Sequence, residues 1–529
     1  MQASATPEGQ GSYEQVLKAL TISQRGSYTD LSYMPVFRAS ALFYAVCGTH
    51  INTRVGFLNY WREKNQVEGI GVLVTVRDAQ GTKTLRQHSL LTDMTGHYDL
   101  RQMLDSAGHA SADFTGSMEL EFFSAQDLKF QFPGVTVFYQ TPGGVSYVHT
   151  NQRVYNHAED KARGAPLNAW QTGFDVFANQ NPFVYLVNGP TAFVGGMADV
   201  VAISANGDTY SETIALPAMA AYATHNWQVN SAAALTEFLG SDPGMCKLNL
   251  PLEDVHLRLG VGHAVPGDPW HSVTHSFFDA TEQADYFNTP SLATDTCPAF
   301  IPFVLPAQLD VDLVLYPIYS RAKMRLTLGG YRDDGQLVFM QDVGTYQTPQ
   351  DGIRRLVIRE LLAQHELSAM ASLYVLRFDP QDVPKLPNRI TYGLNFRQGQ
   401  RLGTNISASA YVARSWGIGP RSWKWGAVVL LPGARNEIMI CALRNGKSDT
   451  DTATGTVSIY DQAGLVVKQA FALKDCTAQT FHAEALLAQV SYISADSIVW
   501  YVVESAQAWL DVVGITVSAQ GNVGGDHSF

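Results

Sequence analysis

The second quarter of the chain holds the densest set of side chains that could bind a metal ion. His256, His263 and His271 follow one another closely, and Asp254 precedes them. Asp254 and His256 are two residues apart, so they would share one face of a strand. Imidazole and carboxylate groups together suit zinc, iron or copper. We therefore predict a divalent metal site from these four residues, with polar histidines at loop tips as the alternative and no other cofactor.

Three further histidines stand near the ends of similar polar segments. His149 and His275 each lie about 68 residues after a turn glycine, and His527 lies about 63 residues after another. A histidine repeated at one point of related domains can join a strand end to a backbone carbonyl. We predict that these three residues are architectural rather than catalytic.

Several tryptophans, whose side chains are large and amphipathic, lie near the expected domain junctions and loops. Aromatic faces with adjacent polar groups suit the binding of sugars, whereas packing between domains is the alternative. The candidate ligand-binding residues for a glycan are Trp61, Trp270, Trp416, Trp423, Trp425 and Arg421.

The sequence lacks the common catalytic signatures. It contains no G-x-x-x-x-G-K-[ST] loop, no G-x-S-x-G elbow and no H-E-x-x-H helix motif. Nucleotide-binding, serine-hydrolase and zincin sites of the familiar kinds are thus excluded. A site assembled from distant loops stays open, but the pattern favours a protein that is not an enzyme.

The elements that must position these residues form a repeat. A strand followed by a polar turn occurs four times, and the turn glycines Gly81, Gly207, Gly335 and Gly464 are about 126 to 129 residues apart. A unit of that length matches a whole β-sandwich domain rather than a solenoid repeat. We predict an all-β protein of four tandem β-sandwich domains, immunoglobulin-like or jelly-roll-like.

The repeat also divides the chain. We predict an N-terminal tail with a short helix at residues 1–29, and sandwiches at 30–160, 161–288, 289–412 and 413–529, the third being the most divergent. Ser12 and Gln15 fit a capping box for the short helix. Leucine-containing pairs in each unit, such as Leu361-Leu362 and Leu486-Leu487, fall where a connection follows the hairpin.

The composition limits the classes of partner that the protein can bind and the cellular compartments that suit it. The 529 residues carry a formal net charge of −12 and no basic stripe, so a nucleic acid is excluded as partner. No apolar run reaches the length of a membrane span. The N-terminus shows no signal peptide, which favours the cytoplasm or a non-classical route to a particle or surface. Cys441 and Cys476 could pair in an oxidising compartment.

Three functions fit this pattern. The first is a non-enzymatic tandem β-sandwich module for binding, spacing or assembly, with a glycan or protein partner and with oligomers allowed. The second is a carbohydrate-active or metal-dependent enzyme with its site in the second repeat or at a domain junction. The third is a structural subunit of a virion or other particle. We expect the features that all four copies share to determine the fold. We expect the functional residues to lie where the copies differ.

Overall fold

The computed structural model describes most of the chain beyond residue 35. The described residues are 36–130, 132–150, 152–154, 170–177, 180–229, 232–240, 242–252, 255–257, 259–265, 270–279, 298–317, 321–348, 351–367, 371–382, 386–387, 390–412, 421–443, 452–492 and 496–529. The short helix predicted near residue 12 lies outside them. The predicted domain boundaries stay predictions, because residues around 160 and 288 and those after 412 also lie outside.

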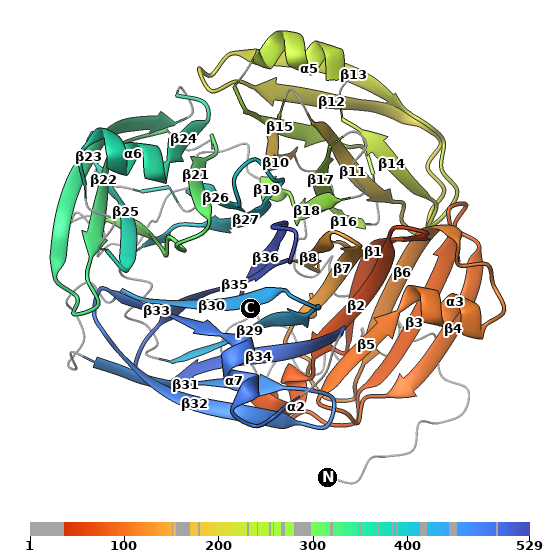
Figure 1. The fold of residues 1–529 in the computed structure, drawn as a ribbon. Coiled ribbons are helices and arrows are strands. Elements are labelled where there is room, and N and C mark those ends of the chain that lie inside the picture. Colours follow the sequence, from red (N-terminus) through yellow and green to blue (C-terminus); the bar gives the residue numbers. More distant parts are fainter. Residues whose placement is uncertain are drawn as a thin grey trace, which may run out of the picture.

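The strands and helices fall into four sets along the chain (Figure 1). The first set is β1 (Arg38–Gly48), β2 (Asn52–Leu58), α2 (Tyr60–Asn65), β3 (Gly71–Asp78), β4 (Lys83–Leu90), β5 (Thr95–Asp99), α3 (Leu100–Ser106), β6 (Asp113–Phe123), β7 (Val135–Thr141), β8 (Gly144–His149) and β9 (Gln152–Val154). The second is β10 (Trp170–Val176), β11 (Asn181–Val187), β12 (Gly196–Ile203), β13 (Thr209–Leu216), β14 (Thr224–Gln228), α5 (Ala232–Leu239), β15 (Gly244–Asn249), β16 (Val255–Leu257), β17 (Gly260–Ala264), β18 (His271–His275) and β19 (Phe277–Asp279).

The third and fourth sets repeat this order. The third is β20 (Ala299–Phe303), β21 (Asp310–Leu315), β22 (Ala322–Tyr331), β23 (Leu337–Thr348), β24 (Arg354–Val357), α6 (Ile358–Gln364), β25 (Leu373–Pro380), β26 (Thr391–Arg397), β27 (Thr404–Ser409) and β28 (Tyr411–Val412). The fourth is β29 (Ser422–Leu430), β30 (Arg435–Ala442), β31 (Thr452–Tyr460), β32 (Leu465–Lys474), β33 (Thr477–His482), α7 (Ala483–Ala488), β34 (Ser497–Ser505), β35 (Leu510–Val517) and β36 (Val523–His527).

Each set builds two antiparallel sheets, so the chain is an all-β protein of tandem sandwich units. One sheet contains the repeated hairpin, with the order β13-β12-β15-β10-β19 in the second unit. The other, which we call the axial sheet, has the order β14-β11-β17-β18. In the first unit a single pairing, Cys47 with Asn52, merges the two into one sheet, which also takes in β16 of the second unit.

Sequence periodicity explains which face of each hairpin is buried. In β32 the buried side chains of Val467, Phe471 and Leu473 alternate with exposed lysines and alanines, as expected for a strand with one face toward solvent. The leucine-containing pairs fall in short helices. Each helix follows the outer edge strand of an axial sheet (β5, β14, β24 or β33), as Leu486 and Leu487 in α7 show. The predicted strand followed by a helical turn at residues 354–365 is confirmed by β24 and α6.

One local prediction was wrong. The sequence predicts a strand over residues 55–62, but β2 ends at Leu58 and Tyr60 to Asn65 form helix α2. Asn59 caps this helix, because its side chain accepts a hydrogen bond from the backbone N–H of Arg62. Asparagine is among the strongest N-cap residues, and this local bond outweighs the strand preference of the aromatic residues.

The four turn glycines have positive φ values of 83°, 86°, 83° and 137°, and three of the turns touch the next unit along the chain. A Cβ atom on Gly81 would overlap the carbonyl oxygen of Ala221, and one on Gly335 would overlap that of Asp475. Gly352 approaches the backbone of Gly207 equally closely. Each contacted residue belongs to the loop just before β14, β24 or β33, so the three contacts are equivalent.

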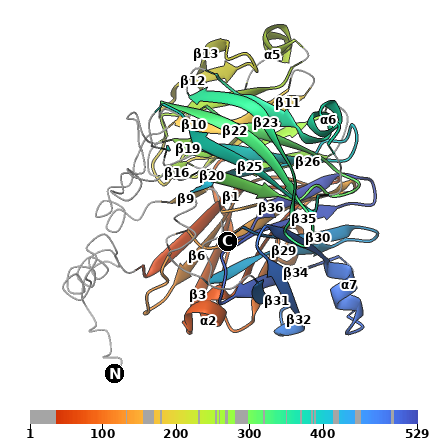
Figure 2. The same ribbon diagram turned by 90° about the vertical axis from the view of Figure 1, so that its left-hand side faces the viewer.

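The turn of the fourth unit makes the corresponding contact with the first unit. Gln462 accepts a hydrogen bond from the backbone N–H of Met94 (3.2 Å), and its side chain donates to Asp93 (2.7 Å). Those residues stand just before β5, which is the same place in the first unit. The four units therefore form a closed ring around a common axis (Figure 1), and Figure 2 shows the same ring from the side.

Replacing Gly81 with alanine tests the turn contact. The change strains a positive φ and pushes a methyl group into Ala221, so we expect a clearly lower thermal unfolding midpoint. Gly69→Ala is the matched control, because Gly69 has a φ of 71° and open space around it. Calorimetry on both variants measures the difference. Equal midpoints would show that the turn contact adds nothing to the backbone strain.

The charged groups around Arg54 give a second prediction. Arg54 contacts Asp99 of its own unit and Asp496 of the fourth unit, both at 2.9 Å. Burial raises the pKa of Asp99, but Asn52, the N–H of Gln102 and Arg54 together hold it below its usual value. The stabilisation is therefore present in full above about pH 4 and is lost as the pH falls through the lowered folded-state pKa.

We expect Asp99→Asn to lower the free energy of unfolding by about 1 to 3 kcal/mol at pH 7, since asparagine keeps the helix cap but loses the charge. The difference from the unmodified protein should shrink below about pH 4. Urea titrations at pH 7, 4 and 3 measure it. Asp105→Asn, an exposed change in the same helix, is the control. A difference that does not change with pH would contradict the ion-pair explanation.

Candidate metal centre

The last long strand of each axial sheet lies next to the axis of the ring. These strands are β8, β18, β27 and β36, and they meet at the centre of Figure 1. Bonds between side chains and backbone join successive strands: Ser146 Oγ accepts from Val273 N (2.8 Å), Ser272 Oγ donates to Gly403 O (2.6 Å), and Thr404 Oγ1 donates to Gly525 O (3.3 Å). The four strands thus form a small closed bundle.

Close backbone approach completes the bundle between the fourth and first units. Gly524 lies so close to β8 that a Cβ atom there would overlap the carbonyl oxygen of Val145. Asn522 donates from its side chain to Gly143 O (3.0 Å) nearby. Only glycine at position 524 lets β36 sit against β8 in this way.

The strand register places one residue of each unit at the same end of the bundle. His149 pairs with Thr136, His275 with Gly260 and Ser409 with Thr391, each opposite the start of the preceding strand. His527 pairs with Val513, the fourth residue of β35. The repeated spacing in the sequence had identified three of these four positions. The third unit has serine where the others have histidine.

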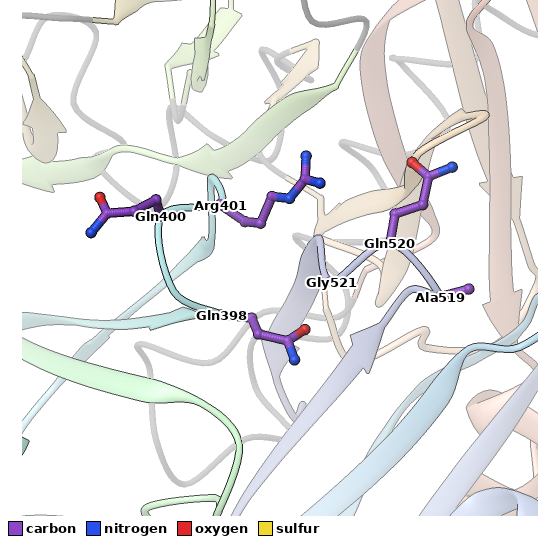
Figure 3. A pocket seen from close by; sticks show the side chains of 6 residues that line it. All are labelled: Gln398, Gln400, Arg401, Ala519, Gln520 and Gly521. Carbon is purple, nitrogen blue, oxygen red and sulfur yellow. The ribbon is translucent and has the colours of Figure 1, made fainter.

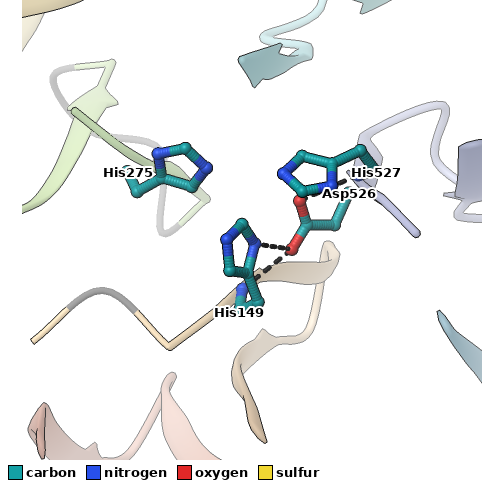
Figure 4. Close-up of side chains that lie close together, drawn as sticks. All are labelled: His149, His275, Asp526 and His527. Carbon is teal, nitrogen blue, oxygen red and sulfur yellow. Dashed lines mark hydrogen bonds and ion pairs between the residues drawn. The ribbon is translucent and has the colours of Figure 1, made fainter. Parts of the chain in front are cut away.

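The three histidines meet with a carboxylate (Figure 4). One ligand atom from each of His149, His275, Asp526 and His527 lies within 4.8 Å of the others. The ring of His149 is centred 4.6 Å from those of both other histidines. His149 is 5% exposed and His275 is 1% exposed, so the cluster is largely shielded from water.

Two of the three imidazoles are oriented by an acceptor near the Nδ1 atom. Nδ1 lies 3.1 Å from the carbonyl oxygen of the next residue in His275 and in His527. This agrees with the predicted contact between a terminal histidine and a backbone carbonyl. Such a contact favours the tautomer with a proton on Nδ1, which leaves the lone pair on Nε2. Metal-binding histidines are commonly oriented in this way.

Asp526 joins the fourth unit to the first. Its Oδ2 atom accepts from the backbone N–H of His149 (2.8 Å) and lies 2.9 Å from the Nδ1 atom of the same residue. Burial raises the pKa of Asp526, but His149, His527 and that N–H together hold it below its usual value. The carboxylate is therefore ionised at neutral pH. Sequence reasoning missed Asp526, because the other units have no acidic residue at that position.

Three imidazoles and one carboxylate form a donor set typical of zinc. Phe529 covers one side of it, with its ring centred 5.0 Å from that of His149, and Trp425 stacks on Phe529 at 4.9 Å. This aromatic layer limits access of water from that side. The arrangement can hold one cation between the first, second and fourth units.

Two residues of the metal site predicted in the second unit, His263 and His271, are not brought together. His263 pairs with Ser272 and His271 with Ala264, so the two histidines point to opposite faces of the sheet. His263 lies beside Phe177 and His271 beside Phe183. Asp254 and the side chain of His256 lie outside the described residues.

The tryptophans predicted to bind a glycan pack inside the protein. Trp61 and Trp270 are at most 1% exposed, while Trp423 and Trp425 are 9% and 5% exposed. Trp61 donates to the carbonyl oxygen of Leu128. These positions favour the packing alternative. Arg421 is exposed and pairs with Glu504 at 3.3 Å, and Trp416 lies outside the described residues.

A surface hollow of about 590 Å³ lies at the other end of the axial strands. It is lined by Gln398, Gln400, Arg401, Ala519, Gln520 and Gly521 (Figure 3). These residues belong to the loops that precede β27 and β36, whereas the histidines stand where β8, β18 and β36 end.

Comparisons with known proteins give no family. No family model matches the sequence, and no curated protein matches it either. A tetra-tandem repeat from the extending region of a large adhesion protein is 11% identical over 92% of this chain and 98% of its own, with a TM-score of 0.10. A glycoside hydrolase of family 32 from Bifidobacterium adolescentis is 9% identical over 93% and 100%, with a TM-score of 0.13. Scores this low carry no inference about function.

Within the described residues, no helix is long and apolar enough to cross a membrane. The sulfur atoms of Cys441 and Cys476 are free thiols in this structure.

Proposed function

We propose that the protein is a non-enzymatic β-sandwich scaffold for binding or assembly, and that one zinc-like divalent ion at its axis holds the ring closed. The convergence of His149, His275, Asp526 and His527 supports this most directly. The residues come from three different units, so an ion bound by all of them would link parts of the chain that are hundreds of residues apart. Metal binding would then add to the stability of the closed ring.

The number of ligands favours a structural role over a catalytic one. Structural zinc sites are usually saturated by four protein ligands, whereas catalytic ones keep a position open for water or substrate. Here four side chains are available, and His149 and His275 are buried. A metal-dependent enzyme with its site at this junction is the competing function, and it requires one of the four to leave the metal.

The assembly part of the proposal rests on the shape of the molecule. A closed ring presents four similar outer hairpins on a rigid frame, which suits the display of repeated contact surfaces. The predicted glycan ligand receives little support, because the described tryptophans proposed for it are buried.

Metal analysis tests the proposed site. Untagged protein stripped with a chelator and refilled should bind one Zn²⁺ per chain, and its thermal midpoint should rise on refilling, since a ligand at 100 times its dissociation constant adds about 2.7 kcal/mol. His275→Ala and His527→Ala should each abolish stoichiometric binding. His88→Ala, a change at an exposed histidine of β4, should leave the metal content unchanged.

Cobalt substitution separates the competing functions. A Co²⁺ spectrum typical of four-coordinate sites, unchanged by added azide, is expected for a saturated structural site. A spectrum that shifts with azide would reveal an open position and would favour the enzyme. Failure of the untreated and refilled protein to retain any metal would refute the metal site.

A further inference from the structure

A second polar site lies between the second and third units, away from the histidine cluster. It is a cavity of about 80 Å³. Its walls come from β10, β17 and β18 on one side and from β21, β24, β26 and β27 on the other. The residues used below are Asp175, Phe177, Gln180, His263, Asp312, Arg355, Phe396 and Arg397.

One wall of the cavity is already fully bonded. The carboxylate of Asp175 accepts hydrogen bonds from Tyr316 (2.7 Å), Asn395 (2.7 Å) and Asn405 (3.1 Å). Burial raises the pKa of Asp175. These bonds link the two units and hold the amide groups in place, so this wall is rigid.

The charges on the opposite wall balance one another. Asp312 is fully buried and forms an ion pair with Arg355, and its carboxylate lies 3.5 Å from Arg397. Arg397 also approaches Asp310 at 3.8 Å. A small ion would have to disrupt these pairs, so a charged ligand gains little here.

Five polar atoms of lining residues have no hydrogen-bond partner among the described residues. They are Nδ1 of His263, Oε1 of Gln180, Oδ1 of Asp312 and the Nε atoms of Arg355 and Arg397. A buried polar atom without a partner costs about 1 to 3 kcal/mol. Burial lowers the pKa of His263 to about 4, so its ring is neutral at physiological pH. The cavity thus offers both acceptors and donors, and its buried charged groups are paired.

The size of the cavity and its apolar walls limit the kinds of ligand that can bind there. At about 30 Å³ for each water, the cavity has room for roughly three water molecules, which equals a molecule of two or three carbon atoms with their oxygens. The rings of Phe177 and Phe396 supply apolar surface beside the polar atoms. Arg401 lines both this cavity and the surface hollow of Figure 3, which places the cavity close to solvent.

We propose that this cavity binds a small neutral polyol of about two or three carbons, such as glycerol. A hydroxyl group both donates and accepts, so a polyol can bond to the unpaired atoms without adding charge, and its C–H groups can lie against the two phenylalanine rings. The proposal rests on these contacts alone and is independent of the metal site.

Isothermal titration calorimetry with ethylene glycol and glycerol tests the proposal. We expect one site per chain, with a dissociation constant in the millimolar range for ligands of this size. His263→Phe keeps the ring shape and Gln180→Leu keeps the length, and each removes one unpaired atom. Each variant should bind at least fivefold more weakly, while its thermal midpoint without ligand stays equal or rises. Gln400→Leu, the same type of change in the surface hollow, should bind both polyols normally.

The possible outcomes separate the proposal from its rivals. Binding of acetate or phosphate in preference to both polyols would identify an anion site and overturn it. Lack of any one-site heat from ethylene glycol and glycerol, or equal affinity in His263→Phe, would show that the cavity holds only water. Calorimetry is preferred to melting curves, because polyols stabilise most proteins through exclusion from their surface.

Discussion

One contact determines the rest of the structure. It joins the hairpin turn of one unit to the loop that precedes β5, β14, β24 or β33 in the next unit. It is a heterologous contact, and repeating it must produce either an open helix or a closed ring. Here the rotation closes after four units, because the turn near Gly464 meets Asp93 and Met94 of the first unit. Closure brings the last strand of every unit to one axis. The histidine cluster is a consequence of that geometry.

The sequence predicted what is encoded locally. Turn glycines, alternating strands and the leucine pairs of the short helices follow from backbone conformation and one-sided burial, so the tandem all-β architecture could be predicted. Helix α2 could not, because one hydrogen bond from Asn59 decided it. Ring closure could not either, because a repeat in sequence does not reveal the rotation between copies.

The candidate site shows the same limit. His263 and His271 are close in sequence, yet neighbouring strands place them on opposite faces. His149, His275 and His527 are far apart in sequence, and their equal positions suggested a separate architectural role for each. In a closed ring, however, equivalent positions on the axis meet, so residues that the copies share can form a site by repetition. Functional residues should therefore be sought both among the positions that the copies share and among those that differ.

The departure of the third unit also has a chemical meaning. Four equivalent histidines around a four-fold axis would lie at one height and would offer a planar set of nitrogens, which suits copper(II) or nickel(II). The third unit instead has Ser409, and the fourth ligand comes from Asp526, one residue before His527 on the same strand. One residue along a strand is a rise of about 3.3 Å. Three imidazoles and one carboxylate offset along the strand are a set of four donors suited to a structural zinc site, because zinc takes nitrogen and oxygen ligands in a tetrahedral arrangement.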